Sequence, residues 1–259
     1  QWLKAEGKDI RMLYSPLDAL EIARENPGKE VVFLAIGFET TTPIYTLLLQ
    51  EIIDRTINNL SLLTSLFTIP AAVSFLARDP ECQIECLLAA GHVCSITGTK
   101  VYEQLSHELN MPIAITGFEP ADLLYGIYRV IQLKAQGKNT AVNAYRRAVP
   151  ERGNEIAQAA TNRFFMPYDA HWRGLGTIPA GGLKLRPEYE QYDARNRFPC
   201  NVKPDIRPSM CRAGEIMKGK ISPRECPLFA SRCTPDTPLG ASMVSSEGAC
   251  AAFYRYNTN

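Results

Sequence analysis

The sequence predicts an α/β protein: parallel-sheet layers with helices on both faces, followed by a small domain that is irregular and partly helical. Three observations lead to this fold class. Short continuous apolar runs, typical of buried parallel strands, alternate with amphipathic stretches of helical spacing over residues 1–190. Several of these runs end in a glycine-containing turn that opens a helix. Beyond about residue 190 the apolar periodicity fades, and prolines, glycines and cysteines accumulate.

We therefore expect two regions. Residues 1–190 form the α/β body, divided near residue 109 into two similar half-units, and residues 191–259 form a cysteine-rich domain. The two half-units contain a similar motif. GFETTTP at 37–43 and GFEPAD at 117–122 each follow an apolar run and precede a helix.

The first half-unit begins with a helix over residues 16–25, where Leu17, Leu20 and Ala23 recur at near-helical spacing. Residues 31–36 form a continuous apolar run that predicts a buried parallel strand. After the GFETTTP turn, residues 44–55 are helical. Thr42 is expected to cap this helix, with Pro43 at its first position.

The second half-unit contains short strands at 87–90 and 113–116, each ending in a glycine, and a helix over 123–136. Residues 143–165 indicate helix, turn, helix. Residues 168–183 form a glycine-rich loop in which Trp172 and Arg173 stand side by side. This loop is either a docking surface for a partner or an ordinary crossing between the body and the tail.

Polar residues at the carboxyl ends of the predicted strands are the candidate site, because sites in open parallel sheets form at those ends. We expect them to converge on one cleft. Each also has a structural interpretation: the threonines and Asp122 as helix caps, and His92 as a packed core histidine. The candidates are Glu39, Thr40, Thr41, His92, Glu119 and Asp122.

Composition excludes two classes of partner. The chain has 259 residues, 46% hydrophobic and 21% charged, with a net charge of +1, which gives no electrostatic footprint for nucleic acid. No apolar run approaches the ~20 residues of a membrane span. The amino terminus lacks both a signal-peptide layout and an initiator methionine, so we expect a fragment of a longer, cytoplasmic protein.

Four cysteines in the tail are the strongest chemical signal. Cys211, Cys226, Cys233 and Cys250 are spaced C-x14-C-x6-C-x16-C in a stretch with few core-forming side chains. Four thiolates bind zinc or a [4Fe–4S] cluster, or they close two disulfides. In a reducing compartment, metal is the favoured alternative.

The other cysteines are weaker candidates. Cys82 and Cys86 are four residues apart in a predicted helix, but their amphipathic setting favours packing, as it does for Cys94. Cys200, eleven residues before Cys211, is a weak fifth candidate for the tail site.

Long motifs in this sequence resemble the HypD family of [NiFe]-hydrogenase maturation factors. They cover the chain from about residue 10 to its end. They are GFETTTP (37–43), GHV-x-SI-x-G (91–98), GFEPADLL (117–124), N-x-YRR-x-V-x3-GN (143–154), WRGLG-x-IP (172–179) and CPLFASRCTPDTPLGASMVSSEGACAAFY (226–254).

The resemblance implies a specific role. Proteins of this family are scaffolds, rather than classical enzymes, in assembly of the iron centre that carries cyanide and carbon monoxide, the Fe(CN)2CO unit. They act with a small HypC-like chaperone and a HypE-like cyanide donor. They carry a [4Fe–4S] cluster with a redox role, which the resemblance assigns here to Cys211, Cys226, Cys233 and Cys250. The resemblance thus favours an iron–sulfur domain over zinc.

This sequence departs from the family pattern at three places. Ala213 and Ser242 stand where the family has cysteines, which we assign to a redox-active dithiol beside the cluster. The amino-terminal Cys-Gly-Thr-His motif of the family, taken to hold the nascent iron, has no counterpart before Leu34. A different functional class remains open: an α/β enzyme or module that binds a small anion at its helix starts and carries a zinc-stapled tail.

Overall fold

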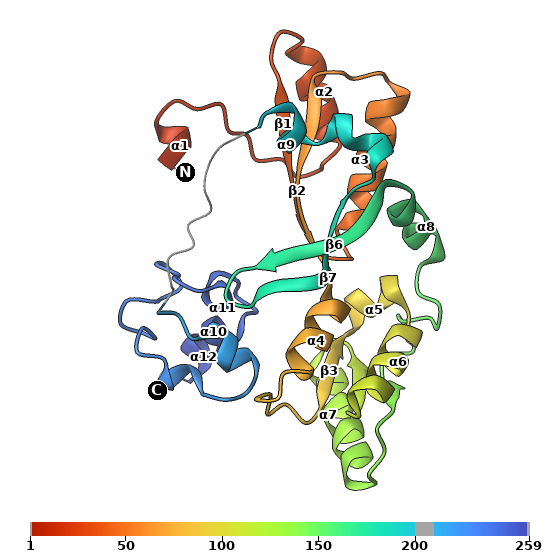
Figure 1. Ribbon diagram of the computed structural model, residues 1–259, viewed down its shortest axis with the longest axis vertical. Coiled ribbons are helices and arrows are strands. Elements are labelled where there is room, and N and C mark those ends of the chain that lie inside the picture. The colour runs from red at the N-terminus through yellow and green to blue at the C-terminus, as the bar shows by residue number, and fades with distance from the viewer. Residues whose placement is uncertain (1, 200–209, 258–259) are drawn as a thin grey trace.

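Two sheets and a compact tail organise the chain (Figure 1). The computed structural model describes residues 2–199 and 210–257. The first sheet has the order β1-β2-β7-β6 and the second the order β3-β4-β5. The predicted α/β class with helices on both faces is confirmed.

The first sheet is mixed. β1 (Val31–Gly37) pairs in parallel with β2 (Leu60–Phe67), which in turn pairs antiparallel with β7 (Gly176–Leu185). β6 (Phe165–Trp172) completes the sheet beside β7. The prediction of a parallel strand over 31–36 is confirmed. The expectation that it is buried is wrong for one face, because Leu34 and Ile36 are 57% and 58% exposed on this edge strand.

Helices α2 (Asp18–Glu25) and α3 (Thr42–Asp54) lie within the core of the first sheet. Leu20 of α2 and Leu48, Leu49 and Ile52 of α3 are buried with the β2 residues Leu60 and Leu62. The predicted helices at 16–25 and 44–55 are therefore confirmed. Thr41 rather than Thr42 is the residue that precedes the first turn of α3.

The second sheet is entirely parallel. β3 (Leu87–Ala90), β4 (Ile113–Thr116) and β5 (Ala141–Asn143) pair side by side. On one face, Ile113 and Ile115 pack with Tyr102 of α6 (Lys100–Leu109). On the other, Gly126 of α7 (Pro120–Ala135) lies against Thr116, where a Cβ would come within 2.9 Å of the threonine Cβ. The alternating strand pattern thus places helices on opposite faces.

The predicted division near residue 109 falls between α6 and β4, inside the second sheet. The chain changes sheet after β2, through α4 (Ile69–Ala77), and returns after β5 through α8 (Glu155–Phe164). The sequence similarity between 37–43 and 117–122 corresponds to a structural similarity, because each segment joins a strand to a helix. Strand pairing places β3, before residue 109, in the same sheet as β4 and β5, after it.

Two predicted segments differ from the structure. Residues 143–165 contain the last residue of β5, an irregular turn, the single helix α8 and the first residue of β6, because the YRRAVPERGN stretch does not form a helix. Residues 168–183 form a hairpin of β6 and β7 rather than a loop. Two of its glycines form the turn at the tip of the hairpin. Gly174 and Gly176 both have φ of +87°, a backbone conformation that other residues rarely adopt.

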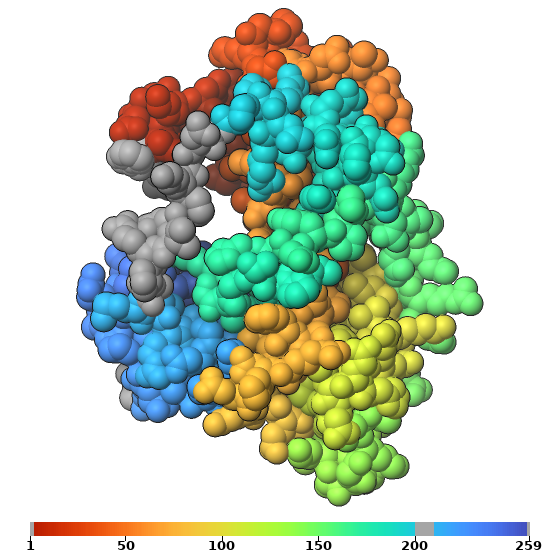
Figure 2. Space-filling view, viewed as in Figure 1, coloured from red at the N-terminus to blue at the C-terminus, as the bar shows by residue number. Residues whose placement is uncertain are grey.

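The tail forms a small domain with its own core. Ile216, Leu228 and Met243 are buried there together with three of the cysteines. Figure 2 shows the tail (blue) against the hairpin (teal) and the loop after α4 (orange). In that loop Asp79 pairs with Lys218, and Glu81 pairs with Lys220 at 2.7 Å. The elements of the tail are α10 (Ala213–Met217), η2 (Pro223–Glu225), α11 (Ala241–Val244) and α12 (Ala249–Tyr256).

Short elements complete the described chain: α1 (Trp2–Ala5), α5 (Gly91–Thr97), η1 (Pro187–Tyr192) and α9 (Ala194–Arg197). Over residues 2–199 and 210–257, no helix combines the length and the apolar character that crossing a bilayer requires.

Candidate functional site

The carboxyl edge of the second sheet carries a group of polar and aromatic side chains. Tyr145, just after β5, packs against the two glycines that end β3 and β4. A Cβ on Gly91 would lie 2.5 Å from the Tyr145 ring, and one on Gly117 would lie 2.6 Å from it. Glycine is therefore needed at both positions because the tyrosine ring occupies the space that a side chain would fill.

Asp122 and Arg147 form the central ion pair of this edge. Arg147 donates to both carboxylate oxygens of Asp122, at 2.7 and 2.6 Å. The arginine also lies over the Tyr145 ring at 4.5 Å and reaches Glu119 at 3.3 Å. Hydrogen bonding to Arg147 lowers the pKa of Asp122, so this buried carboxyl group is an ionised, paired acid rather than a free base.

The predicted cap at Asp122 is wrong. Glu119 occupies the position before α7, and Asp122 is the third residue of the helix. His92 is exposed, and its ring packs on Phe118 with centroids 5.0 Å apart, so it is not a core histidine. The structure thus brings His92, Glu119 and Asp122 to one edge. Tyr145 and Arg147 were not among the predicted site residues, although both lie in the YRR segment of the motif at 143–154.

Replacing Arg147 by methionine should reduce stability at pH 7 and flatten its acid dependence. The folded pKa of Asp122 is depressed, so its contribution is present above the unfolded pKa of about 4 and is lost as pH falls through the folded pKa. Urea unfolding of wild type and variant at pH 7, 5 and 3 checks this. The difference between them should shrink as the pH falls. Arg146→Met, the neighbouring arginine, is the control, and equal curves for all three proteins would contradict the assignment.

Glu39 lies apart from this edge, at the end of β1. Its Oε1 accepts a 2.8 Å hydrogen bond from the amide of Ile69, the first residue of α4. Its Oε2 is buried and, within the described residues, has no hydrogen-bond partner. Burial raises the pKa of Glu39 to about 7. This carboxyl group therefore changes charge near neutral pH.

The surroundings of Glu39 come from the second unit. Its negative charge contributes to raised pKa values at Cys94 in α5 and Tyr102 in α6, where burial is the larger cause. The Tyr102 hydroxyl is likewise buried. The Glu39 carboxyl group, buried at Oε2, thus interacts electrostatically with Cys94 and Tyr102 of the second unit.

The threonines after Glu39 have structural roles. Thr41 Oγ1 both accepts from the Phe38 amide and donates to its carbonyl, each at 3.1 Å. Thr42 donates to the same carbonyl at 2.9 Å and is fully buried. Gly37 must be glycine here, since a Cβ would lie 1.8 Å from Thr41 Oγ1. Thr40, half-buried, is the member of the predicted pair whose hydroxyl does not close this turn.

The residues that were predicted to form one cleft thus lie in two separate groups. Glu119 and Asp122 both form ion pairs with Arg147. Glu39 instead accepts a hydrogen bond from the first residue of α4 and interacts electrostatically with Cys94 and Tyr102. They are connected through α5, which carries His92 in its first turn and Cys94 half a turn later.

The four tail cysteines are gathered in one place. Cys226, Cys233 and Cys250 belong to the small core of the tail, each 7–8% exposed. Burial and, to a lesser extent, the charges of the other three cysteines raise the pKa of Cys250 to about 11, which places all four within electrostatic reach. The amide of Leu239 donates to Cys233 Sγ at 3.4 Å.

Backbone groups border two of the four sulfurs. A Cβ on Gly240 would lie 2.2 Å from Cys211 Sγ, so the glycine leaves room for that sulfur. Amide donation to sulfur, as at Cys233, is a contact by which proteins tune iron–sulfur centres. Among the residues that the structure describes, no three His, Cys, Asp or Glu side chains are placed to hold a single ion.

The remaining cysteines do not join this group. Cys82 and Cys86 lie in the irregular segment between α4 and β3, so the predicted helix there is wrong. Cys94 is fully buried, and burial raises its pKa to about 12, as expected for a packed cysteine. Cys200 lies outside the described residues. Ala213 and Ser242, where the family pattern has cysteines, are both buried.

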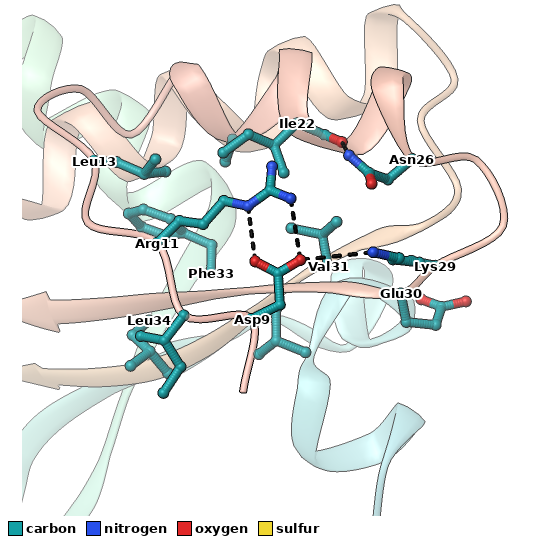
Figure 3. Close-up of a pocket in the computed structure, with 13 residues that line it drawn as sticks. Asp9, Arg11, Leu13, Ile22, Asn26, Lys29, Glu30, Val31, Phe33 and Leu34 are labelled. Atoms are coloured by element: carbon teal, nitrogen blue, oxygen red, sulfur yellow. Dashed lines mark hydrogen bonds and ion pairs between the residues drawn. The ribbon is translucent and has the colours of Figure 1, made fainter. Parts of the chain in front are cut away.

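A cavity of about 530 Å³ lies elsewhere, between the amino-terminal segment, α2 and β1 (Figure 3). Its walls are largely apolar, with Leu13, Ile22 and Phe33 among the lining residues. Charged residues also line it, and there the Asp9 carboxylate lies between Arg11 and Lys29. None of the predicted site residues lines it.

Comparison with known proteins gives one consistent result. Residues 1–257 match the family model HypD, described as the hydrogenase formation hypA family. The chain is 42% identical over 257 residues to a protein of Escherichia coli (strain K12) named hydrogenase maturation factor HypD. It is 41% identical over 258 residues to a protein of the same name from Rhodobacter capsulatus. In each case the match covers 98% of this chain and 68% of the relative.

Proposed function

This chain belongs to the HypD family and acts in hydrogenase maturation, and from that premise we propose that it is a scaffold for assembly of the Fe(CN)2CO unit of [NiFe]-hydrogenases. We propose further that Cys211, Cys226, Cys233 and Cys250 hold a [4Fe–4S] cluster and that the protein works in the reducing cytoplasm. The observation that carries the cluster is the convergence of four cysteines around one small core.

The geometry favours this reading over an anion-binding module with a zinc tail. The Glu39 carboxyl group already occupies the start of α4. Glu119 and Asp122 place two acids at the start of α7, where an anion would be repelled. The side chains of Thr41 and Thr42 bond the Phe38 carbonyl at the start of α3. Acids therefore lie at the start of α7, one of the two helix starts that the anion-binding alternative requires.

A bound cluster would supply one-electron transfer. The residues of the chain have other tasks in this proposal. Glu39, with a pKa near 7, takes up or releases a proton beside the assembling iron unit. His92, exposed on the edge of the second sheet, is a hydrogen-bond partner or proton relay there. Thr40 and Thr41 line the turn that carries Glu39.

Metal analysis tests this function directly. Protein purified without air should contain about four iron and four sulfide per chain, following the four-thiolate pattern. Iron, acid-labile sulfide and zinc are measured on the same sample. Stoichiometric zinc without sulfide would remove the cluster assignment.

The partners proposed from the family are a small HypC-like chaperone and a HypE-like cyanide donor. α7 offers a surface of the right kind. Leu124, Tyr128 and Ile131 recur at helical spacing on its outer face and are 69%, 58% and 60% exposed. Such an apolar stripe on a water-facing helix is typical of a protein interface.

We expect Ile131→Glu to weaken binding of the HypC-type chaperone from the same organism by about tenfold or more, since a charge would enter an apolar contact. Titration calorimetry with both purified proteins measures this. Ile156→Glu, at another exposed isoleucine on α8, is the control. Equal affinity of the Ile131→Glu variant and the wild type would place the chaperone elsewhere.

A further inference from the structure

The tip of the β6–β7 hairpin reaches the cysteine domain at two points (Figure 1). Arg173 donates through Nη2 to the carbonyl of Leu239 at 2.8 Å. The carbonyl of Gly174 lies against Gly214, where a Cβ would come within 2.7 Å of that oxygen. The tip therefore fits closely against the start of α10 and against the loop that precedes α11.

The loop that Arg173 contacts covers two of the four cysteines. Leu239 donates its amide to Cys233 Sγ at 3.4 Å. The next residue, Gly240, lies so close to Cys211 that a Cβ would be 2.2 Å from its sulfur. A contact that holds the Leu239 carbonyl in place thus fixes two neighbouring groups: the Leu239 amide, which contacts Cys233, and the Gly240 backbone, which borders Cys211.

Arg173 extends from a fixed platform. The neighbouring Trp172 donates its indole N–H to the Gly181 carbonyl at 2.9 Å, across the hairpin. Its ring packs edge-on against Phe67 at the end of β2, with centroids 4.9 Å apart. The backbone at 172–173 is therefore held by the first sheet, so that the arginine anchors the tail loop to the body.

We propose that Arg173 is a positioning residue of the cysteine site: it holds the loop at 239–240 over Cys211 and Cys233, so that these two thiolates are shielded and correctly oriented. This role rests on the proposed function only in that the ligand of the thiolates is a [4Fe–4S] cluster. The contacts of residues 239 and 240 involve the sulfurs of Cys211 and Cys233 and not those of Cys226 and Cys250.

The decisive measurement needs no metal. In the full chain stripped of metal, the alkylation rate of each cysteine by iodoacetamide is followed by peptide mass analysis. Arg173→Gln should speed alkylation of Cys211 and Cys233 roughly three- to tenfold, the effect of losing one modest hydrogen bond. Cys226 and Cys250 should stay within about twofold, which a general loosening of the tail would not allow.

Matched variants sharpen the result. Arg186→Gln removes an arginine that also donates to a backbone carbonyl, that of Asn162 at 2.7 Å, at the far end of β7, and it should change no rate. Arg173→Lys keeps a charged donor and should restore part of the protection. Unchanged rates at Cys211 and Cys233 in Arg173→Gln, or equal acceleration of all four cysteines, would overturn the proposal.

A second readout separates this inference from the cluster itself. In protein purified without air, Arg173→Gln should release iron to a ferrous chelator about three- to tenfold faster than wild type. Wild-type protein that contains no iron and no sulfide would refute the proposed cluster, and the alkylation rates would still decide the role of Arg173.

Discussion

Replacing Cys233 by serine is expected to abolish the proposed iron–sulfur cluster and to loosen the tail. Cys233 is 7% exposed and receives the Leu239 amide, so its sulfur is fixed within the small core. Loss of one thiolate leaves one iron of a four-thiolate cluster without its protein ligand. Metal binding and local folding are coupled in such small domains, so the tail should also open. The same result is expected for Cys211, Cys226 and Cys250.

Iron and sulfide content, visible absorbance and limited proteolysis measure the effect of each variant. Iron should fall from about four per chain to near zero, and cleavage within residues 210–257 should become rapid. Cys82→Ser and Cys86→Ser, at half-buried thiols in the loop before β3, are the controls and should keep the cluster. A cluster that survives in Cys233→Ser, or is lost in Cys82→Ser, would show that the ligand set is wrong.

Replacing Glu39 by glutamine is expected to remove most of the pH dependence of stability between pH 4.5 and 7. Burial raises the pKa of this carboxyl group from its ordinary value of 4.5 to about 7, which corresponds to about 3 kcal/mol. A raised folded pKa means that the stabilisation is fully present below the unfolded pKa. It is lost as pH rises through the folded pKa. The wild type should therefore lose stability over this range, and the variant should not.

Glutamine is nearly isosteric, and its carbonyl oxygen can still accept the Ile69 amide. At pH 8 the variant should exceed the wild type by up to about 3 kcal/mol, measured by urea unfolding at pH 5, 6, 7 and 8. Glu119→Gln, at an exposed carboxyl group, is the control. Parallel stability curves for wild type and Glu39→Gln would mean that the carboxyl group does not carry this titration.

Local patterns in the sequence were sufficient for part of the fold. The apolar runs at 31–36, 87–90 and 113–116 are strands, and the 3.6-residue spacing at 16–25 and 123–136 marks helices. Each of these signals lies within a few residues of chain. When a run of apolar residues is followed directly by a glycine and a helix, the strand can be predicted from these neighbouring residues alone.

The failures arose where distant contacts decide the structure. The β6–β7 segment was predicted to be a glycine-rich loop because β7 joins the sheet through β2, more than a hundred positions earlier in the chain, and β6 pairs only with β7. Arg147 was missed because its importance comes from Asp122, 25 residues away. Glu39 was proposed as a site residue, but its environment could not be predicted. That environment is formed by α4 and the second unit, and the periodicity of the sequence around Glu39 carries no information about them. The tail cysteines were visible because their chemistry, and not their packing, identifies them.

The return of the chain to the first sheet has a consequence for the order in which the protein folds. Leu66 of β2 pairs with Leu183 of β7, so the first sheet stays incomplete until the hairpin leaves the ribosome. The second sheet needs only residues 87–143 and can form earlier. Once it has folded, it brings the two ends of the intervening chain together and lowers the entropic cost of closing the outer sheet. Until then β2 presents an open edge, which makes this interval the one in which nascent chains are most exposed to mispairing.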